Sequence, residues 1–131
     1  MIFVDTGAWF AAVVPNDPSH GDVVSVMEHY VDERVTTDYV LDETITLLAR
    51  RGEAERAIRL GRRLLEEKVA RLEWVNAPDA ARALIIFERH ARNGWSFTDC
   101  TSLVVMQRLA IEEAVALDHH FKQFGGITVV P

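Results

Sequence analysis

Short apolar runs that each end at an acidic residue constrain the fold of this 131-residue chain more than any other feature. Ile2-Phe3-Val4 is followed by Asp5, and residues 114–117 (Ala-Val-Ala-Leu) are followed by Asp118. Runs of three or four apolar residues are too short for helices and are typical of buried strands. Longer helical segments lie between them. This alternation predicts an α/β fold with a central parallel β-sheet flanked by α-helices on both faces.

Capping and turn residues set the bounds of the other elements. We expect strands at 2–4, 35–37, 72–75, 114–117 and 127–130, and helices at 8–14, 19–31, 38–51, 53–68, 78–93 and from 96–98 to 110. The chain has no internal repeat and no linker rich in Pro, Gly or Ser. One domain over residues 1–131 is therefore expected at this length.

Composition and charge exclude several classes of protein. The 20 acidic residues exceed the 14 basic ones, giving a net charge of −6, which argues against a protein that coats nucleic acid without specificity. No apolar stretch is long enough to span a membrane, and the N-terminus lacks the basic region of a signal peptide. The single Cys100 excludes an intrachain disulfide and a zinc site made of cysteines, so a reducing cytoplasmic location is expected.

Asp5 and Asp118 are expected to meet at one edge of the sheet. Each follows a predicted strand, and parallel strands all end at the same edge. Open α/β sheets bind their ligands at that carboxyl edge. The two carboxylates are therefore placed together by topology alone.

Two further acids occupy unusual positions on predicted helices. Glu43 lies between Val40 at i−3 and Leu47 at i+4, so it is on a partly apolar face. Asp99 begins an apolar stripe that continues with Leu103 and Met106. A carboxylate that faces a protein core is costly unless it has a partner. Four carboxylates that converge suit a hard divalent cation such as Mg²⁺ or Mn²⁺.

Each acid also has a purely structural interpretation. Asp5 and Asp118 could cap the helices that follow them. Asp99 could pair with Ser96 in a capping box, and the Glu43 side chain could extend from the edge of its stripe into water. Because the two strand-end acids converge by topology and the two helical acids break the polar pattern of their helices, a shared metal site is favoured over four separate structural roles.

Four sequence blocks in this order resemble a PIN-domain nuclease, in particular a VapC-type toxin of a bacterial or archaeal toxin–antitoxin pair. They are residues 2–6 (IFVDT), 41–44 (LDET), 96–100 (SFTDC) and 116–121 (ALDHHF), and the likeness extends over essentially the whole chain. It implies a PIN-like domain whose acidic site contains Asp5, Glu43, Asp99 and Asp118. Thr6 and Thr98 match supporting hydroxyl residues of such proteins, whereas Gly7 stands where serine is frequent.

The resemblance also implies a function. Such proteins are ribonucleases that hydrolyse RNA phosphodiester bonds with Mg²⁺ or Mn²⁺, form homodimers, and bind an antitoxin whose tail covers the acidic site. The net charge does not oppose an RNA substrate. If a metal neutralises four of the acids, the remaining 16 acidic and 14 basic residues nearly balance.

Three arginines are possible RNA contacts. Arg56, Arg59 and Arg63 lie at i, i+3 and i+7 on one face of a predicted helix, within the segment 50–71 that holds eight of the 14 basic residues. The favoured alternative is a solvated face with ion pairs to Glu55 and Glu67 at i±4.

Other residues with chemical potential have ordinary explanations. His119 and His120 follow Asp118 and could contact substrate or metal, but a surface pair is favoured. Cys100 is expected to fill the core as a small apolar residue. Trp9 and Phe10 belong to a helix that is apolar nearly all round, so it is either buried or part of a partner surface.

Two other functions are compatible with acids at a sheet edge or with a PIN-like fold. A phospho-acceptor receiver domain also gathers acids at a sheet edge, but it needs a lysine after a late strand. The only lysines, Lys68 and Lys122, do not follow a strand directly. A PIN fold that binds RNA or protein without cleavage is opposed by the presence of all four acids.

Overall fold

The computed structural model describes residues 1–131 and contains a five-stranded sheet in the order β3-β2-β1-β4-β5. All four pairings are parallel, with Phe3 on the central strand opposite Val35 on one side and Ala114 on the other. The strands are β1 (Ile2–Val4), β2 (Arg34–Thr37), β3 (Arg71–Glu73), β4 (Glu113–Val115) and β5 (Thr128–Val130).

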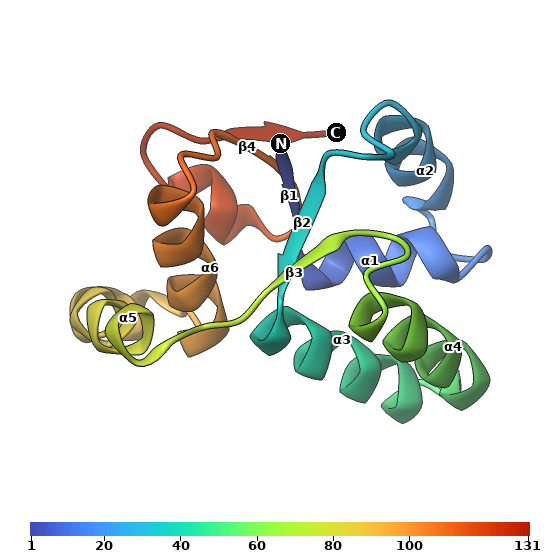
Figure 1. The fold of residues 1–131 in the computed structure, drawn as a ribbon, viewed down its shortest axis with the longest axis horizontal. Helices are drawn as coiled ribbons and strands as arrows, with labels where there is room; N and C mark the ends of the chain where they lie inside the picture. The colour runs from blue at the N-terminus through green and yellow to red at the C-terminus, as the bar shows by residue number, and fades with distance from the viewer.

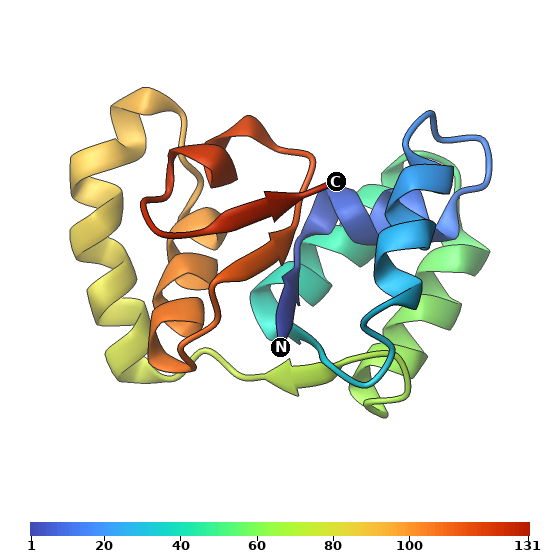
Figure 2. The same ribbon diagram turned by 90° about the horizontal axis from the view of Figure 1, so that it is seen from above.

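Helices flank the sheet on both sides. They are α1 (Thr6–Val13), α2 (His20–Glu28), α3 (Asp38–Arg50), α4 (Ala54–Leu65), α5 (Ala77–His90) and α6 (Phe97–Arg108), with 3₁₀ turns η1 (Ala91–Asn93) and η2 (His119–Gln123). The α5 and α6 helices lie on one side of the strands and α1, α2 and α4 on the other (Figure 1), as the view from above also shows (Figure 2). The predicted α/β fold is confirmed. None of the helices combines the length and apolar character needed to cross a membrane.

Polar side chains define where several helices begin. The Thr37 hydroxyl accepts a hydrogen bond from the Val40 amide at the start of α3. Ser96 and Asn76 each begin a capping box, at α6 and α5. Helix ends were predicted less well: α2 and α4 end three residues earlier than expected, and α4 is followed by Glu67 in the left-handed region, at φ 53°.

The core fixes the central strand and the helix that follows it. All three residues of β1 are fully buried. The Trp9 indole nitrogen donates to the Thr36 hydroxyl (3.3 Å), which donates to the Val4 carbonyl (2.9 Å). These bonds join α1, β2 and β1 directly beside Asp5, so the backbone that carries this acid is held in place.

The strand order creates a crevice at the carboxyl edge of the sheet. From β1 the chain passes to β2 and β3 on one side and then returns to β4 on the other. Ligands bind at such a switch point in open α/β sheets. Asp5 directly follows β1, but Asp118 lies three residues beyond β4, because pairing ends at Val115 rather than at Leu117. Both acids still reach this edge.

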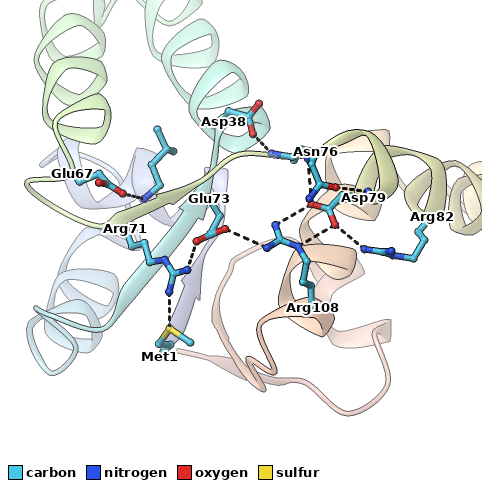
Figure 3. A network of polar contacts seen from close by, with 11 residues as sticks. Met1, Asp38, Glu67, Arg71, Glu73, Asn76, Asp79, Arg82 and Arg108 are labelled. Atoms are coloured by element: carbon cyan, nitrogen blue, oxygen red, sulfur yellow. Dashed lines mark hydrogen bonds and ion pairs between the residues drawn. The ribbon is translucent and has the colours of Figure 1, made fainter.

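A second polar cluster, the Asp79 network, joins α5, α6 and β3 on another part of the molecule (Figure 3). The Asp79 side chain is fully buried. Its carboxylate accepts hydrogen bonds from Arg82 (2.8 Å), from Arg108 (3.1 and 3.0 Å) and from the Asn76 backbone (3.3 Å). Arg108 lies between Asp79 and Glu73, which also pairs with Arg71. The network therefore holds two helices against the edge of the sheet.

Candidate metal centre

Asp5 is the most deeply buried of the four candidate acids, with 4% of its surface exposed. It occupies the cap position of α1, but its side chain accepts no capping hydrogen bond, so the capping interpretation is wrong for this residue. Its Oδ1 atom is buried without a hydrogen-bond partner. Burial, together with repulsion from Asp99, Glu43 and Asp118, raises the pKa of Asp5 to about 8.

Glu43 reaches the same place from α3. Its side chain is half-buried, and its Oε1 accepts a 2.6 Å hydrogen bond from the Thr6 hydroxyl. Burial raises the pKa of Glu43, and repulsion from Asp99 and Asp118 adds to the shift against the opposing Thr6 bond. Thr6 therefore contacts the site as the resemblance implied.

Asp99 both caps a helix and lies among the other acids. It completes the capping box of α6, since its Oδ2 accepts from the Ser96 amide (2.9 Å) and its own amide donates to the Ser96 hydroxyl (3.0 Å). It is also 5% exposed and faces other carboxylates. Burial and repulsion from Asp118 raise its pKa despite the Ser96 bonds. Capping and membership of the acidic cluster are thus compatible.

Asp118 is the most exposed of the four, with 39% of its side chain accessible. Its Oδ1 accepts a hydrogen bond from the His120 amide (2.9 Å) and so caps the η2 turn, as the structural interpretation predicted. The charge of Asp118 also raises the pKa values of Asp5, Glu43 and Asp99. The four acids therefore form one electrostatic cluster at the crevice between β1 and β4.

No lysine or arginine forms an ion pair with any member of this cluster. The hydrogen bonds of Glu43, Asp99 and Asp118 each engage one carboxylate oxygen, and Asp5 has no side-chain hydrogen bond. Each acid thus keeps at least one oxygen available. Buried, unpaired oxygen donors of this kind are the ligand set that hard divalent cations prefer.

His120 corrects the expectation of a surface histidine pair. His119 is exposed over 75% of its side chain, but His120 is exposed over only 15% and lies among the acids. Its Nδ1 is 2.8 Å from Asp118 Oδ1 and 3.9 Å from Asp99 Oδ2. The sequence contained no signal for this difference, because adjacent residues in a turn give no periodic pattern.

A hollow of about 390 Å³ adjoins the acids. Thr6, Glu43 and Thr98 line it, so Thr98 lies beside the cluster, although its hydroxyl forms no hydrogen bond with an acid. Arg50 also lines it and was not singled out from the sequence. It could have been found, because Arg50 is seven residues from Glu43 on α3 and therefore shares its face.

The three candidate arginines lie elsewhere. Arg56, Arg59 and Arg63 line a separate hollow of about 460 Å³ between α1, α2 and α4. The ion pairs expected from Arg59 and Arg63 to glutamates at i±4 do not form; Glu67 instead accepts from the Leu72 amide. Arg59 and Arg63 are exposed and form no ion pair. For Arg63 the reason is that α4 ends at Leu65, before its expected partner Glu67.

The interior next to the cluster is apolar. Cys100 is fully buried, as expected, and burial raises the pKa of its thiol to about 11, so it is unreactive. Trp9 is buried, whereas Phe10 and Val13 are only partly covered on the same helix. At Gly7, a side-chain carbon would meet Leu117 at an ordinary 3.5 Å, so the fold does not require glycine there.

Comparison with known proteins places this geometry in context. The family model of the PIN domain matches residues 2–127. The 23S rRNA-specific endonuclease VapC20 of Mycobacterium tuberculosis is 36% identical over 136 aligned residues, which cover 100% of this chain and 99% of the relative. A VapC ribonuclease of Archaeoglobus fulgidus is 28% identical over 90% of this chain and 77% of its own length.

Solved structures agree. The crystal structure of VapC20 of M. tuberculosis, described as a sarcin-ricin loop cleaving toxin, superposes over both whole chains with a TM-score of 0.91 at 34% identity. The fold alone is shared with FitAcB of Neisseria gonorrhoeae (TM-score 0.70, 16% identity, 100% of this chain and 97% of that chain).

Proposed function

Because the chain belongs to the PIN-domain family, as a ribonuclease of the VapC type, we propose that it hydrolyses RNA at the cluster of Asp5, Glu43, Asp99 and Asp118 with Mg²⁺ or Mn²⁺. One observation carries the proposal. Burial and mutual repulsion raise the pKa values of Asp5, Glu43 and Asp99 at the carboxyl edge of the sheet, no lysine or arginine is paired to any of the four acids, and the most buried of them has an oxygen with no partner. A protein keeps such an arrangement at a cost, which a bound cation offsets.

The donor chemistry of these residues suits a divalent ion, and a carboxylate oxygen of Asp118 already lies within 4.8 Å of possible ligand atoms of the two histidines that follow it. Asp5 would bind it through the orphaned Oδ1, and Glu43, Asp99 and Asp118 through oxygens that their hydrogen bonds leave free. A divalent cation supplies neutralisation of phosphate oxygens and stabilisation of the leaving oxygen. The protein's contribution is to hold its carboxylates in place before the substrate arrives.

The supporting hydrogen bonds perform that task. Thr6 fixes the Glu43 carboxylate, and Ser96 fixes Asp99 through the α6 capping box. The His120 amide fixes Asp118. Such outer contacts orient ligands and limit the reorganisation needed when substrate binds. The partly exposed Asp118 leaves the cluster open toward solvent on the side where a phosphodiester can approach.

Arg50 is the residue we propose to attract the RNA backbone beside the acids. It is exposed on α3 and lines the same hollow as Glu43 and Thr98. A guanidinium group binds phosphate oxygens in a bidentate manner. Arg56, Arg59 and Arg63 would act further away, as a second basic surface for flanking nucleotides.

The substrate class follows from the relatives. A relative that matches the chain from end to end is named for cleavage of 23S rRNA, so we propose a structured loop of ribosomal RNA as the substrate. Mapping the 5′ ends of RNA after incubation with intact ribosomes would test it. A single cut in ribosomal RNA supports the proposal, and cuts confined to transfer or messenger RNA contradict it.

An antitoxin protein and a second copy of the chain are the proposed partners. The toxin description of the 34%-identical structure supports the antitoxin. Inhibition of RNA cleavage by the product of an adjacent small reading frame would test that partner. Sedimentation of the free protein would test the homodimer.

Asp5→Asn is the direct test of the site. We expect cleavage that requires Mg²⁺ or Mn²⁺ to be lost by at least about 100-fold, because the amide supplies one neutral oxygen in place of a carboxylate. Asp22→Asn, an exposed acid on α2, is the matched control and should cleave normally. If Asp5→Asn folds and cleaves like the unaltered protein, the proposal is wrong. RNA binding without cleavage by the unaltered protein, with either ion, would favour the binding module instead.

A further inference from the structure

The imidazole of His120 is built into the acidic cluster. Its ring nitrogen Nδ1 lies 2.8 Å from Asp118 Oδ1 and 3.9 Å from Asp99 Oδ2, so it stands between carboxylates that come from different parts of the chain. Only 15% of the side chain is exposed. The ligand atoms of Asp118, His119 and His120 can all lie within 4.8 Å of one another.

The Nδ1 atom of His120 is buried but has no hydrogen-bond partner. The nearby Asp118 oxygen is at hydrogen-bond distance but not in hydrogen-bond geometry. Only four buried side-chain polar atoms in the protein are unpartnered in this way, and two of them, Asp5 Oδ1 and His120 Nδ1, belong to the cluster. A buried nitrogen that has no hydrogen-bond partner and lies within 4 Å of two carboxylates is placed as a metal ligand would be.

The fold holds the ring in this position. Its other nitrogen, Nε2, lies only 3.3 Å from where a side-chain carbon at residue 94 would be, and that residue is Gly94, with φ 86°. On another side the ring packs against His119, with centroids 4.1 Å apart. The Asp118 cap fixes the backbone of the turn that carries it. A ring confined in this way can present Nδ1 to the cluster.

We propose that His120 Nδ1 is a ligand of the divalent cation, which makes the site a mixed nitrogen and oxygen site that prefers Mn²⁺ to Mg²⁺. This inference rests on the proposed function and specifies its cofactor. Imidazole nitrogen suits transition metals, whereas Mg²⁺ prefers oxygen donors only. The carboxylates alone would not discriminate in this way.

The test measures metal binding directly, without RNA. Calorimetric titration with Mn²⁺ and with Mg²⁺ would compare the unaltered protein with His120→Ala. We expect His120→Ala to weaken Mn²⁺ binding by about tenfold or more and Mg²⁺ binding by less than about threefold. His29→Ala is the matched control: it removes an exposed imidazole that lies outside the group of Asp118, His119 and His120, and it should bind both ions normally.

Pulsed electron paramagnetic resonance of bound Mn²⁺ distinguishes a ligand from a residue that merely orients Asp118. A ligating imidazole gives a ¹⁴N coupling, which should be present in the unaltered protein and in His29→Ala and absent in His120→Ala. Because this coupling can be sought in the unaltered protein alone, the test does not depend on the folding of any variant. Bound Mn²⁺ without ¹⁴N coupling, or coupling that survives in His120→Ala, would overturn this inference and leave the proposed function intact. Failure of either ion to bind the unaltered protein would overturn the proposed function itself.

Discussion

Asp79 and Asp99 occupy the same place in the same local motif, the third residue of a helix whose capping box their carboxylates complete. Both are buried. Asp79 uses both carboxylate oxygens, which accept hydrogen bonds from Arg82, Arg108 and a backbone amide. Asp99 uses one oxygen for its cap and faces other acids instead of arginines.

The electrostatic consequences are opposite. Burial favours the neutral form of Asp79, but the hydrogen bonds and charges of Arg108 and Arg82 outweigh it and hold the pKa of Asp79 below its usual value. Burial and the charge of Asp118 raise the pKa of Asp99. A capping box thus places a carboxylate, while the charges around it determine whether that carboxylate stabilises the fold or is left without a positively charged partner.

RNA cleavage should show the largest difference between variants of Asp99 and of Asp79. We expect Asp99→Asn to lower RNA cleavage by at least about 100-fold, because it removes a proposed metal ligand while an amide oxygen can still accept the Ser96 bond. Asp79→Asn should change cleavage by less than about threefold at a temperature where it is folded. Initial rates with excess Mn²⁺ would measure both. Equal losses of cleavage in Asp99→Asn and Asp79→Asn would contradict the different roles assigned to the two aspartates.

The free energy of unfolding should change in the opposite order, with the larger loss in the Asp79 variant. Asp79→Asn should lower the free energy of unfolding by about 2–3 kcal/mol, because it leaves Arg108 with a weaker, neutral acceptor in a buried network. Asp99→Asn should cause no loss in metal-free protein, since it relieves repulsion. Urea unfolding in the presence of a chelator would measure both variants, with Asp22→Asn as the control. A larger loss in Asp99→Asn than in Asp79→Asn would contradict the assignment.

The pH dependence of unfolding should sharpen the contrast further. The folded protein holds a proton on Asp5 up to about pH 8, whereas the unfolded chain releases it near pH 3.8. Stability from this group is therefore fully present below about pH 4 and is lost as the pH rises toward 8. Without metal, Asp5→Asn should be more stable than the unaltered protein by about 1–3 kcal/mol at pH 8, with a smaller difference at pH 5. A constant difference between pH 5 and pH 8 would argue against the raised pKa of Asp5.

Replacing Arg82 or Arg108, the two arginines that contact Asp79, should change the free energy of unfolding least, and by different amounts. Arg82 is 53% exposed and forms one contact with Asp79, so Arg82→Ala should cost about 0.5 kcal/mol. Arg108 is 30% exposed and contacts both Asp79 oxygens and Glu73, so Arg108→Ala should cost about 2 kcal/mol. Thermal unfolding would measure both. Equal losses of stability in the two variants would show that the additional contacts of Arg108 with Asp79 and Glu73 contribute nothing.

Much of the fold was predictable because it depends on local rules. Three apolar residues before Asp5 predicted a buried strand, and the structure has β1 at Ile2–Val4. The capping-box pattern from Ser96 to Asp99 fixed the start of α6. The bounds of other elements were less accurate: α4 ends at Leu65, where the chain turns through the left-handed Glu67, and no periodic pattern announces that turn.

The placement of the candidate site was predictable for a different reason. Parallel strands end at one edge, so Asp5 and Asp118 had to approach each other, and the apolar neighbours of Glu43 showed that it points inward. The partners of these residues were not predictable. His120 lies 21 residues from Asp99 in the sequence, and Arg108 lies 29 residues from Asp79. Such contacts depend on how α5, α6 and η2 pack.

The alternation of strands and helices, the edge at which the acids collect and the capping box of Ser96 and Asp99 could all be read from the order of residues along the chain. These features depend on spacing along a chain of fixed geometry. The packing of distant segments brings Arg108 to Asp79, places Asp99 among other acids, and encloses His120 while His119 stays exposed. Charge pairing and burial are properties of neighbours in space, and packing brings those neighbours together from distant parts of the chain.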